Sequence, residues 1–219
     1  MEMLVLQLAD SAFPTGGFAH SAGLEAAHQT GAIRTPDDLH AFVRWTLAQA
    51  GRGALPLVMA AHRDIERLPE IDELCDVFIR NPVANRASRL QGRAWLATAV
   101  RVFDRPLLRR IALLAADHRL ALHQAPVFGA ILSALHVEAS CASELYLFMT
   151  ARAVLSAGVR LGIAGTHEGQ RLQAEVADVI DRVRHRSATL TLDDLAQAAP
   201  LVDLWQAGHD RLYSRLFQS

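Results

Sequence analysis

Apolar residues recur at helical spacing along most of this chain. The clearest example is the segment 166–186. One face of this segment contains the apolar residues Leu172, Val176, Val179, Ile180 and Val183. The other faces contain charged and amide residues: Gln173, Asp178, Asp181 and Arg182. No segment between turn signals alternates apolar and polar positions with β-branched residues, as a half-buried strand would. The pattern therefore predicts an all-α protein.

Proline, glycine and capping residues divide the pattern into separate elements. Thr35-Pro36, followed by two acids, is a typical helix start, and Asn81-Pro82 repeats the capping residue and the proline. Such signals predict helices at about residues 18–30, 36–50, 54–67, 71–79, 83–103, 107–122, 127–135, 142–161, 166–186 and 200–213, with one more short helix starting at Thr191. Short connections then favour one compact domain, a bundle of about ten helices over residues 1–219.

The composition agrees with a folded domain and argues against nucleic acid as a partner. Hydrophobic residues make up 51% of the 219 residues and charged residues 21%, which is the balance of a globular protein. The 22 Lys and Arg residues are matched by 23 acids, whereas nucleic-acid binding usually rests on an excess of positive charge. We interpret the local basic group Arg182, Arg184, His185 and Arg186 as a solvated helix end.

Neither a membrane nor an oxidising compartment is indicated. The longest weakly charged run, residues 120–137, contains His123, Gln124, Pro126 and His136, which favour a buried helix with a turn over a membrane span. The first ten residues include Glu2 and no basic lead-in to an apolar stretch, so no signal peptide is expected. Cys75 and Cys141 form no CxxC pair. We expect a cytoplasmic protein with reduced thiols.

Motifs for chemistry are missing from the sequence. The ten histidines include no HExxH pair, and His118 and His123, five residues apart, fall on different faces of a helix. There is no GxSxG and no phosphate loop with Gly-Lys-Ser/Thr. Thr15-Gly16-Gly17 before a predicted helix offers main-chain N–H groups to an anion but lacks the lysine. The sequence therefore favours a non-catalytic binding protein without a resident metal or cofactor.

Two alternatives of other classes stay open at this point. One is a helical enzyme with an unrecognised cofactor site, which a bound chromophore or metal would reveal. The other is a helical regulator that binds DNA, which salt-sensitive duplex binding would reveal.

Three motifs carry a family resemblance. Residues 6–25 read LQLADSAFPTGGFAHSAGLE, residues 165–172 read GTHEGQRL, and residues 213–219 read YSRLFQS. In this order they resemble the signatures of the UreF family of urease accessory proteins: a Pro-x-Gly-Gly-Phe turn with Ser-x-Gly-Leu-Glu, a Gly-Gln segment and a closing Tyr-Ser-Arg-Leu-Phe. The chain departs from the family pattern at His20, Thr166-His167 and Gln218, where Tyr, Gln-Thr and Arg are common.

The resemblance implies an all-α, dimeric and non-catalytic adaptor. Members of the family bridge the accessory protein UreD, also called UreH, and the GTPase UreG. Their assembly delivers nickel to apo-urease. Nickel is then a cargo passed on by the complex, GTP is bound and hydrolysed by the partner GTPase, and no cofactor is held stably by the adaptor itself.

Both ends of the chain contain the candidate partner-binding residues. In the tail, residues 209–219, aromatic and arginine side chains are of the type that anchors interfaces: Arg211, Tyr213, Ser214, Arg215, Leu216 and Phe217. At the front, we expect a dimer surface or a surface facing the GTPase, formed by Thr15, Gly16, Gly17, Phe18, His20, Ser21 and Glu25. Two alternatives remain for each end. The tail is either disordered until it binds UreD or a last helix packed on its own domain, and the front is either such a surface or a structural turn.

Overall fold

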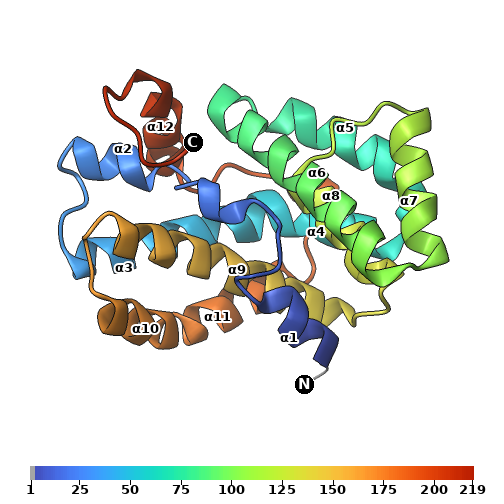
Figure 1. Cartoon of the computed structure of the whole chain (residues 1–219), viewed down its shortest axis with the longest axis horizontal. Helices are drawn as coiled ribbons and strands as arrows, with labels where there is room; N and C mark the ends of the chain where they lie inside the picture. Colours follow the sequence, from blue (N-terminus) through green and yellow to red (C-terminus); the bar gives the residue numbers. More distant parts are fainter. Residues whose placement is uncertain (1–2) are drawn as a thin grey trace.

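A computed structural model describes residues 3–219. Met1 and Glu2, which belong to the predicted domain and to the segment searched for a signal peptide, lie outside the described residues. Within that range the chain forms twelve α-helices and no strand, which confirms the all-α prediction (Figure 1). None of the helices in this range has the length and apolar character needed to cross a bilayer.

The helices follow one another with short connections. In chain order they are α1 (Met3–Ala9), α2 (Leu24–Gln29), α3 (Pro36–Gln49), α4 (Leu55–Arg63), α5 (Leu68–Phe78), α6 (Pro82–Phe103), α7 (Pro106–Asp117), α8 (Gln124–Ala134), α9 (Ala139–Arg160), α10 (Thr166–Glu175), α11 (Ala177–Ser187) and α12 (Pro200–Gly208). Short 3-10 turns lie at Gly17–Ala19, Ile65–Arg67, Leu192–Asp194 and His209–Arg211.

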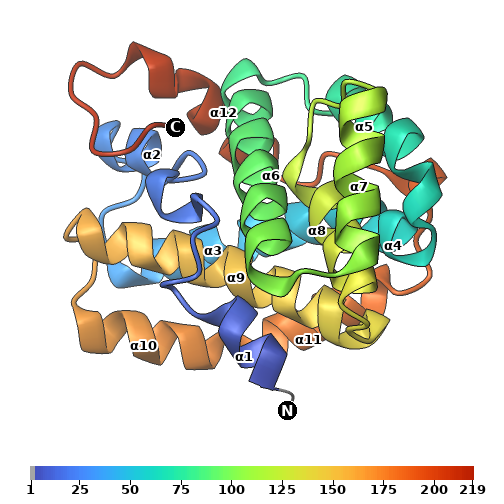
Figure 2. The same ribbon diagram turned by 45° about the vertical axis from the view of Figure 1, so that its right-hand side comes forward.

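The centre of the molecule is α8, which is apolar on all sides. It is packed between α4, α6 and α9, and nearly all of its residues are buried (Figure 2). Phe128 on α8 stands edge-on to Trp95 of α6 and Tyr146 of α9, with ring centroids 5.2 Å apart in each pair. Phe13 continues this cluster, 5.4 Å from Trp95. The loop before the front motif is therefore fixed to the core by an aromatic side chain.

Several predicted helix boundaries are wrong: the helices predicted at 107–122 and 200–213 end at Asp117 and Gly208. Two further errors have a clear local reason. The predicted helix 18–30 is a 3-10 turn at Gly17–Ala19 followed by α2, because Ala22 and Gly23 adopt φ values of +53° and +89° that no helix contains. The predicted helix 166–186 is two helices, α10 and α11, which meet at Val176. Leu172, Val176 and Ile180 all stay buried across that break, so the periodicity did not reveal it.

The glycines at 51 and 53 do not interrupt the chain as predicted. They lie in a π-helical turn, Ala50–Ala54, that leads from α3 directly into α4. A Cβ on Gly51 would lie 2.5 Å from the Val183 side chain of α11, and one on Gly53 would lie 3.2 Å from the Phe78 ring. Both glycines therefore serve close packing rather than a turn.

Gly129 provides a test of the tight packing between α4 and α8. A Cβ built there would overlap the main-chain carbonyl of Val58. Alanine in a helix interior normally stabilises by about 1 kcal/mol, but a clash with main chain should outweigh this gain and destabilise Gly129→Ala by roughly 2 kcal/mol or more. Urea denaturation would measure the change. Gly208→Ala is the control, since nothing lies within 4 Å of its Cβ, and equal stability of the two variants would contradict the packing argument.

Candidate functional site

The two motif-bearing ends of the chain lie side by side. The C-terminus runs along the front segment and α2 in both views (Figures 1 and 2). The Ser21 N–H donates to the Ser219 carbonyl at 2.6 Å, and the Gln218 N–H donates to the Ala19 carbonyl at 2.8 Å. The tail therefore packs on its own chain and is not the free disordered segment of the first alternative. It is not the last helix of the second alternative either, because only the 3-10 turn His209–Arg211 is helical and residues 212–219 are irregular. We call this contact between residues 15–25 and 209–219 the end junction.

Glu25 holds the tail from inside the end junction. Its side chain is 1% exposed, and its two carboxylate oxygens accept hydrogen bonds from the Leu216 N–H at 2.6 Å and the Phe217 N–H at 3.2 Å. Glu25 lies in the first turn of α2, where the helix dipole favours an acid. The ring of His209, also fully buried, comes within 3.7 Å of the same carboxylate. The two hydrogen bonds and the helix dipole compensate for removing the acid from water.

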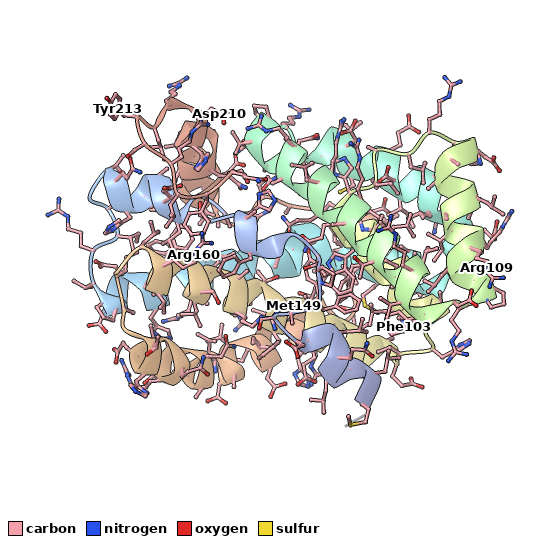
Figure 3. All side chains as sticks on the ribbon, in the orientation of Figure 1. Phe103, Arg109, Met149, Arg160, Asp210 and Tyr213 are labelled. Carbon is pink, nitrogen blue, oxygen red and sulfur yellow. The ribbon has the colours of Figure 1, made fainter. Side chains whose placement is uncertain are left out.

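Arg160, at the end of α9, joins both ends through its guanidinium group. The group lies 4.1 Å from the centre of the Phe18 ring and 4.2 Å from the centre of the Phe217 ring, so it is sandwiched between the two. It also donates a hydrogen bond to the Phe18 carbonyl at 2.7 Å. Figure 3 labels Arg160 beside the front segment, with Tyr213 at the outer edge of the tail.

His20 is buried beside the last residue. Its Nδ1 lies 2.6 Å from the Ser219 hydroxyl, and its side chain is 8% exposed. Burial, followed by the nearby His209 and Arg86, lowers the pKa of His20 from 6.5 to about 4. The fold therefore holds the neutral imidazole.

The glycine of the Ser-x-Gly-Leu-Glu motif packs closely against α12. Gly23 has a φ of +89°, and a Cβ on it would lie 2.8 Å from the Gln206 nitrogen and 3.0 Å from the Val202 carbonyl oxygen. Only glycine satisfies both the backbone angle and the close approach. At Gly23 the front segment therefore has a structural role, as in the alternative that described it as a structural turn.

The predicted partner-binding residues divide into an exposed and a buried set. Phe18, Tyr213 and Leu216 are 68%, 105% and 53% exposed, and the other residues on the surface are Gly16, Arg211, Ser214 and Arg215. Thr15 and Gly17 are half-buried, whereas the residues that hold the tail are buried: His20, Ser21, Glu25 and Phe217. The exposed set is accessible at the surface, and its contacts with a partner stay a prediction.

A cleft of about 600 Å³ opens below the front segment, between it and helices α6 and α9. Five of the predicted front residues line it, together with two arginines of α9: Thr15, Gly16, Gly17, Phe18 and His20, with Arg152 and Arg160. Arg152 donates to the Ala9 carbonyl, and burial lowers its pKa. Thr15-Gly16-Gly17 leads into a three-residue 3-10 turn rather than a long helix, so it lacks the dipole on which its anion-binding interpretation rested.

The remaining sequence motifs lie away from the end junction. The segment 165–172 begins α10, on the far side of α9 from the tail (Figure 1). The basic group at the end of α11 behaves as a solvated helix end, with Arg184 paired to Asp181 at 3.2 Å and His185 bound to the Asp181 carbonyl. Among residues 3–219, no three His, Cys, Asp or Glu side chains are grouped so as to hold a metal ion.

Sequence reasoning missed Arg160 as part of the site, and it included His209 only as the first residue of the tail, without a role. Arg160 is 142 residues from Phe18, and His209 lies near the opposite end of the chain from Glu25. No spacing rule along one chain connects positions so far apart. The only sequence signal was that both lie next to recognised elements, Arg160 at the end of a predicted helix and His209 at the start of the tail.

The chain is similar to known urease accessory proteins. A sequence model of the UreF family matches residues 33–177. Urease accessory protein F of Arabidopsis thaliana is 37% identical over 97% of this chain and 90% of its own length. Its counterpart in Oryza sativa subsp. indica is 35% identical over 96% and 82%, and urease accessory protein UreF of Trichodesmium erythraeum is 27% identical over 99% and 96%. The likeness therefore reaches beyond residues 33–177 into both ends.

Glu25→Gln should release the tail. The substitution keeps the shape of the side chain but turns one acceptor oxygen into an NH₂ group that faces a main-chain N–H. We expect faster amide hydrogen exchange at Leu216 and Phe217 and a loss of about 2 kcal/mol or more in the free energy of unfolding. Gln29→Ala, which removes one exposed hydrogen bond to the Ser214 carbonyl, is the control and should cost about 1 kcal/mol or less. Unchanged exchange in Glu25→Gln would refute the role of this carboxylate.

Acid should destabilise the end junction through His20. Because the folded-state pKa is about 4 and the ordinary value 6.5, the unfolded chain binds the extra proton, and stability is lost as the pH falls through that window. The loss at pH 4 is on the order of 2 to 3 kcal/mol. The free energy of unfolding of His20→Asn should depend less steeply on pH. Part of the dependence should remain, because burial also lowers the pKa of His123. Denaturation at a series of pH values would measure this, with the variant of the exposed His185, His185→Asn, as control. Equal pH dependence of the unfolding free energy in His20→Asn and the wild type would contradict it.

Proposed function

Because the chain belongs to the UreF family of urease accessory proteins, and so serves urease maturation rather than catalysing a reaction itself, we propose that it is a nickel-insertion adaptor bridging UreD (UreH) and the GTPase UreG. Nickel is the cargo that the complex passes to apo-urease, and GTP belongs to the partner GTPase. In this proposal the adaptor works as a cytoplasmic homodimer and binds neither nucleic acid nor a membrane.

The observation that carries the proposal is the way the end junction presents the tail. Glu25 and Ser21 bind its main chain from one side, while Tyr213 and Leu216 point their side chains outward and are largely exposed. A tail that is already ordered loses less conformational entropy on binding than a free one. Tyrosine and arginine side chains are also the usual energetic anchors of interfaces. We assign the tail surface to the UreD-type partner.

The front segment contributes in two ways to the proposed role. Its exposed Phe18 is linked to the buried Phe217 of the tail through Arg160. The turn at Thr15-Gly16-Gly17 faces the cleft beside α9. We assign this turn to the dimer or the GTPase-facing surface.

The variant Tyr213→Ala/Leu216→Ala tests the tail surface. Both side chains are exposed, so the fold should survive, whereas truncation after Gly208 would also remove the buried His209 and Phe217. We expect the dissociation constant for UreD to rise by about thirtyfold, as for loss of a hot spot worth roughly 2 kcal/mol, and nickel-dependent urease activation to fall with it. Leu113→Ala, 57% exposed on α7, is the control. Binding and activation equal to the wild type would refute the assignment.

A further inference from the structure

Arginine is concentrated on α6 in a way that the proposed function does not use. This helix of 22 residues contains Arg86, Arg89, Arg93 and Arg101 and no Asp or Glu. The first three of these, together with Arg80 just before the helix, line a cleft of about 580 Å³ between the end of α5 and the first half of α6. We call it the arginine cleft. Asp76 is the single acid among its lining residues.

The positive charge of the arginine cleft is only partly neutralised. Asp76 forms an ion pair with Arg89, accepts a hydrogen bond from Asn85 at 2.8 Å and lies 3.0 Å from His123 Nε2. These bonds, led by that of Asn85, lower the pKa of Asp76 to about 2. Arg86 binds both oxygens of Asp210, at 2.9 and 3.0 Å.

Two guanidinium groups remain without a counter-charge. Arg80 and Arg93 are exposed and form no ion pair or hydrogen bond through their side chains with any residue between 3 and 219. Each therefore has its full set of donors available to an external acceptor.

Apolar side chains lie in the same cleft. Val77 is 64% exposed and Leu90 is 44% exposed, and both line it. Arg86, Leu90 and Arg93 follow the i, i+4, i+7 spacing of one helix face, about 10 Å long. Guanidinium groups flanking an aliphatic side chain match a segment that offers carboxylates around an aliphatic residue, because arginine binds carboxylates bidentately.

We propose that the arginine cleft binds an acidic helical segment of a protein partner, with Glu or Asp spaced three or four residues apart around an aliphatic residue. Arg80 and Arg93 supply the free charges, and Val77 and Leu90 the apolar contact. The identity of that partner rests on the proposed function: it is the protein seated on the tail. Continuity supports this, since Asp210 of the tail binds Arg86 of the cleft and lies 3.5 Å from Arg215. Figure 3 labels Asp210 near the start of α6.

A nucleic acid fits the arginine cleft less well. Two free guanidinium groups neutralise about two phosphates, whereas duplex binding proteins usually contact six or more. The chain as a whole has a formal charge of −1, so its overall charge does not attract a duplex.

Charge reversal tests the proposal directly. The probe is a fluorescein-labelled helical peptide of about 15 residues with Glu at i, i+4 and i+7 around Leu, compared with its Gln counterpart and with a labelled DNA duplex. Wild-type protein should bind the Glu peptide saturably and more weakly as salt increases. Arg80→Glu/Arg93→Glu should weaken this binding by about tenfold or more with an unchanged midpoint of thermal unfolding. Arg182→Glu, an exposed arginine on α11, is the control and should bind as the wild type does.

The possible results distinguish a failure of the arginine cleft proposal from a failure of the proposed function. Absence of Glu-peptide binding, equal binding of the Gln peptide, or equal affinity in Arg80→Glu/Arg93→Glu would overturn the proposal, as would a duplex that competes for the same arginines with higher affinity. Co-purification with UreD is measured in parallel. If UreD does not bind wild-type protein, the proposed function fails while the peptide titration still decides the cleft. If UreD binds, Arg80→Glu/Arg93→Glu should weaken it and Arg182→Glu should not.

Discussion

The carboxylate of Glu25 accepts two main-chain N–H groups of the tail in a place that water does not reach. An acid withdrawn from water is tolerated only where hydrogen bonds and favourable dipoles replace hydration. Here the Leu216 and Phe217 amides and the start of α2 provide them. The dependence is mutual, since the tail has these partners only while α2 stays in place. Loss of either partner leaves buried polar groups unsatisfied, which costs more than the bond itself contributes.

This constraint determines which way the tail faces. With the main chain of residues 216–219 bound to the front segment, Phe217 is turned inward against Arg160, while Tyr213 and Leu216 remain outside. Gly23 allows α12 to approach closely enough for the tail to reach α2. Asp210 then lies within reach of Arg86 and connects the tail to the arginine cleft. A surface assembled from α6, α9 and both chain ends thus follows from one buried contact.

Much of the fold could be predicted from the sequence, because helical periodicity and capping are local. The helix predicted at 83–103 is α6 almost residue for residue, and the start predicted at Thr35 is a capping box in the structure. The errors occur where packing decides instead. Gly51 looked like a helix stop but lies against Val183 of a helix more than a hundred residues away. The end junction was out of reach for the same reason: motifs at 15–25 and 209–219 were recognised separately, but only the folded chain brings them together.

Two of the departures from the family pattern, Gln218 and His20, lie in the end junction, one on its exposed side and one on its buried side. Gln218 is exposed, and only its main chain contacts the front segment, at the Ala19 carbonyl. Replacing the usual arginine there removes a charge from the outer surface and leaves the anchor intact. His20 is buried against Ser219, with its pKa lowered to about 4. Replacing the usual tyrosine there introduces a group that titrates inside the anchor, so acid weakens the hold on the tail through this residue. A tyrosine, ordinarily neutral up to a pH of about 10, would bring no such sensitivity.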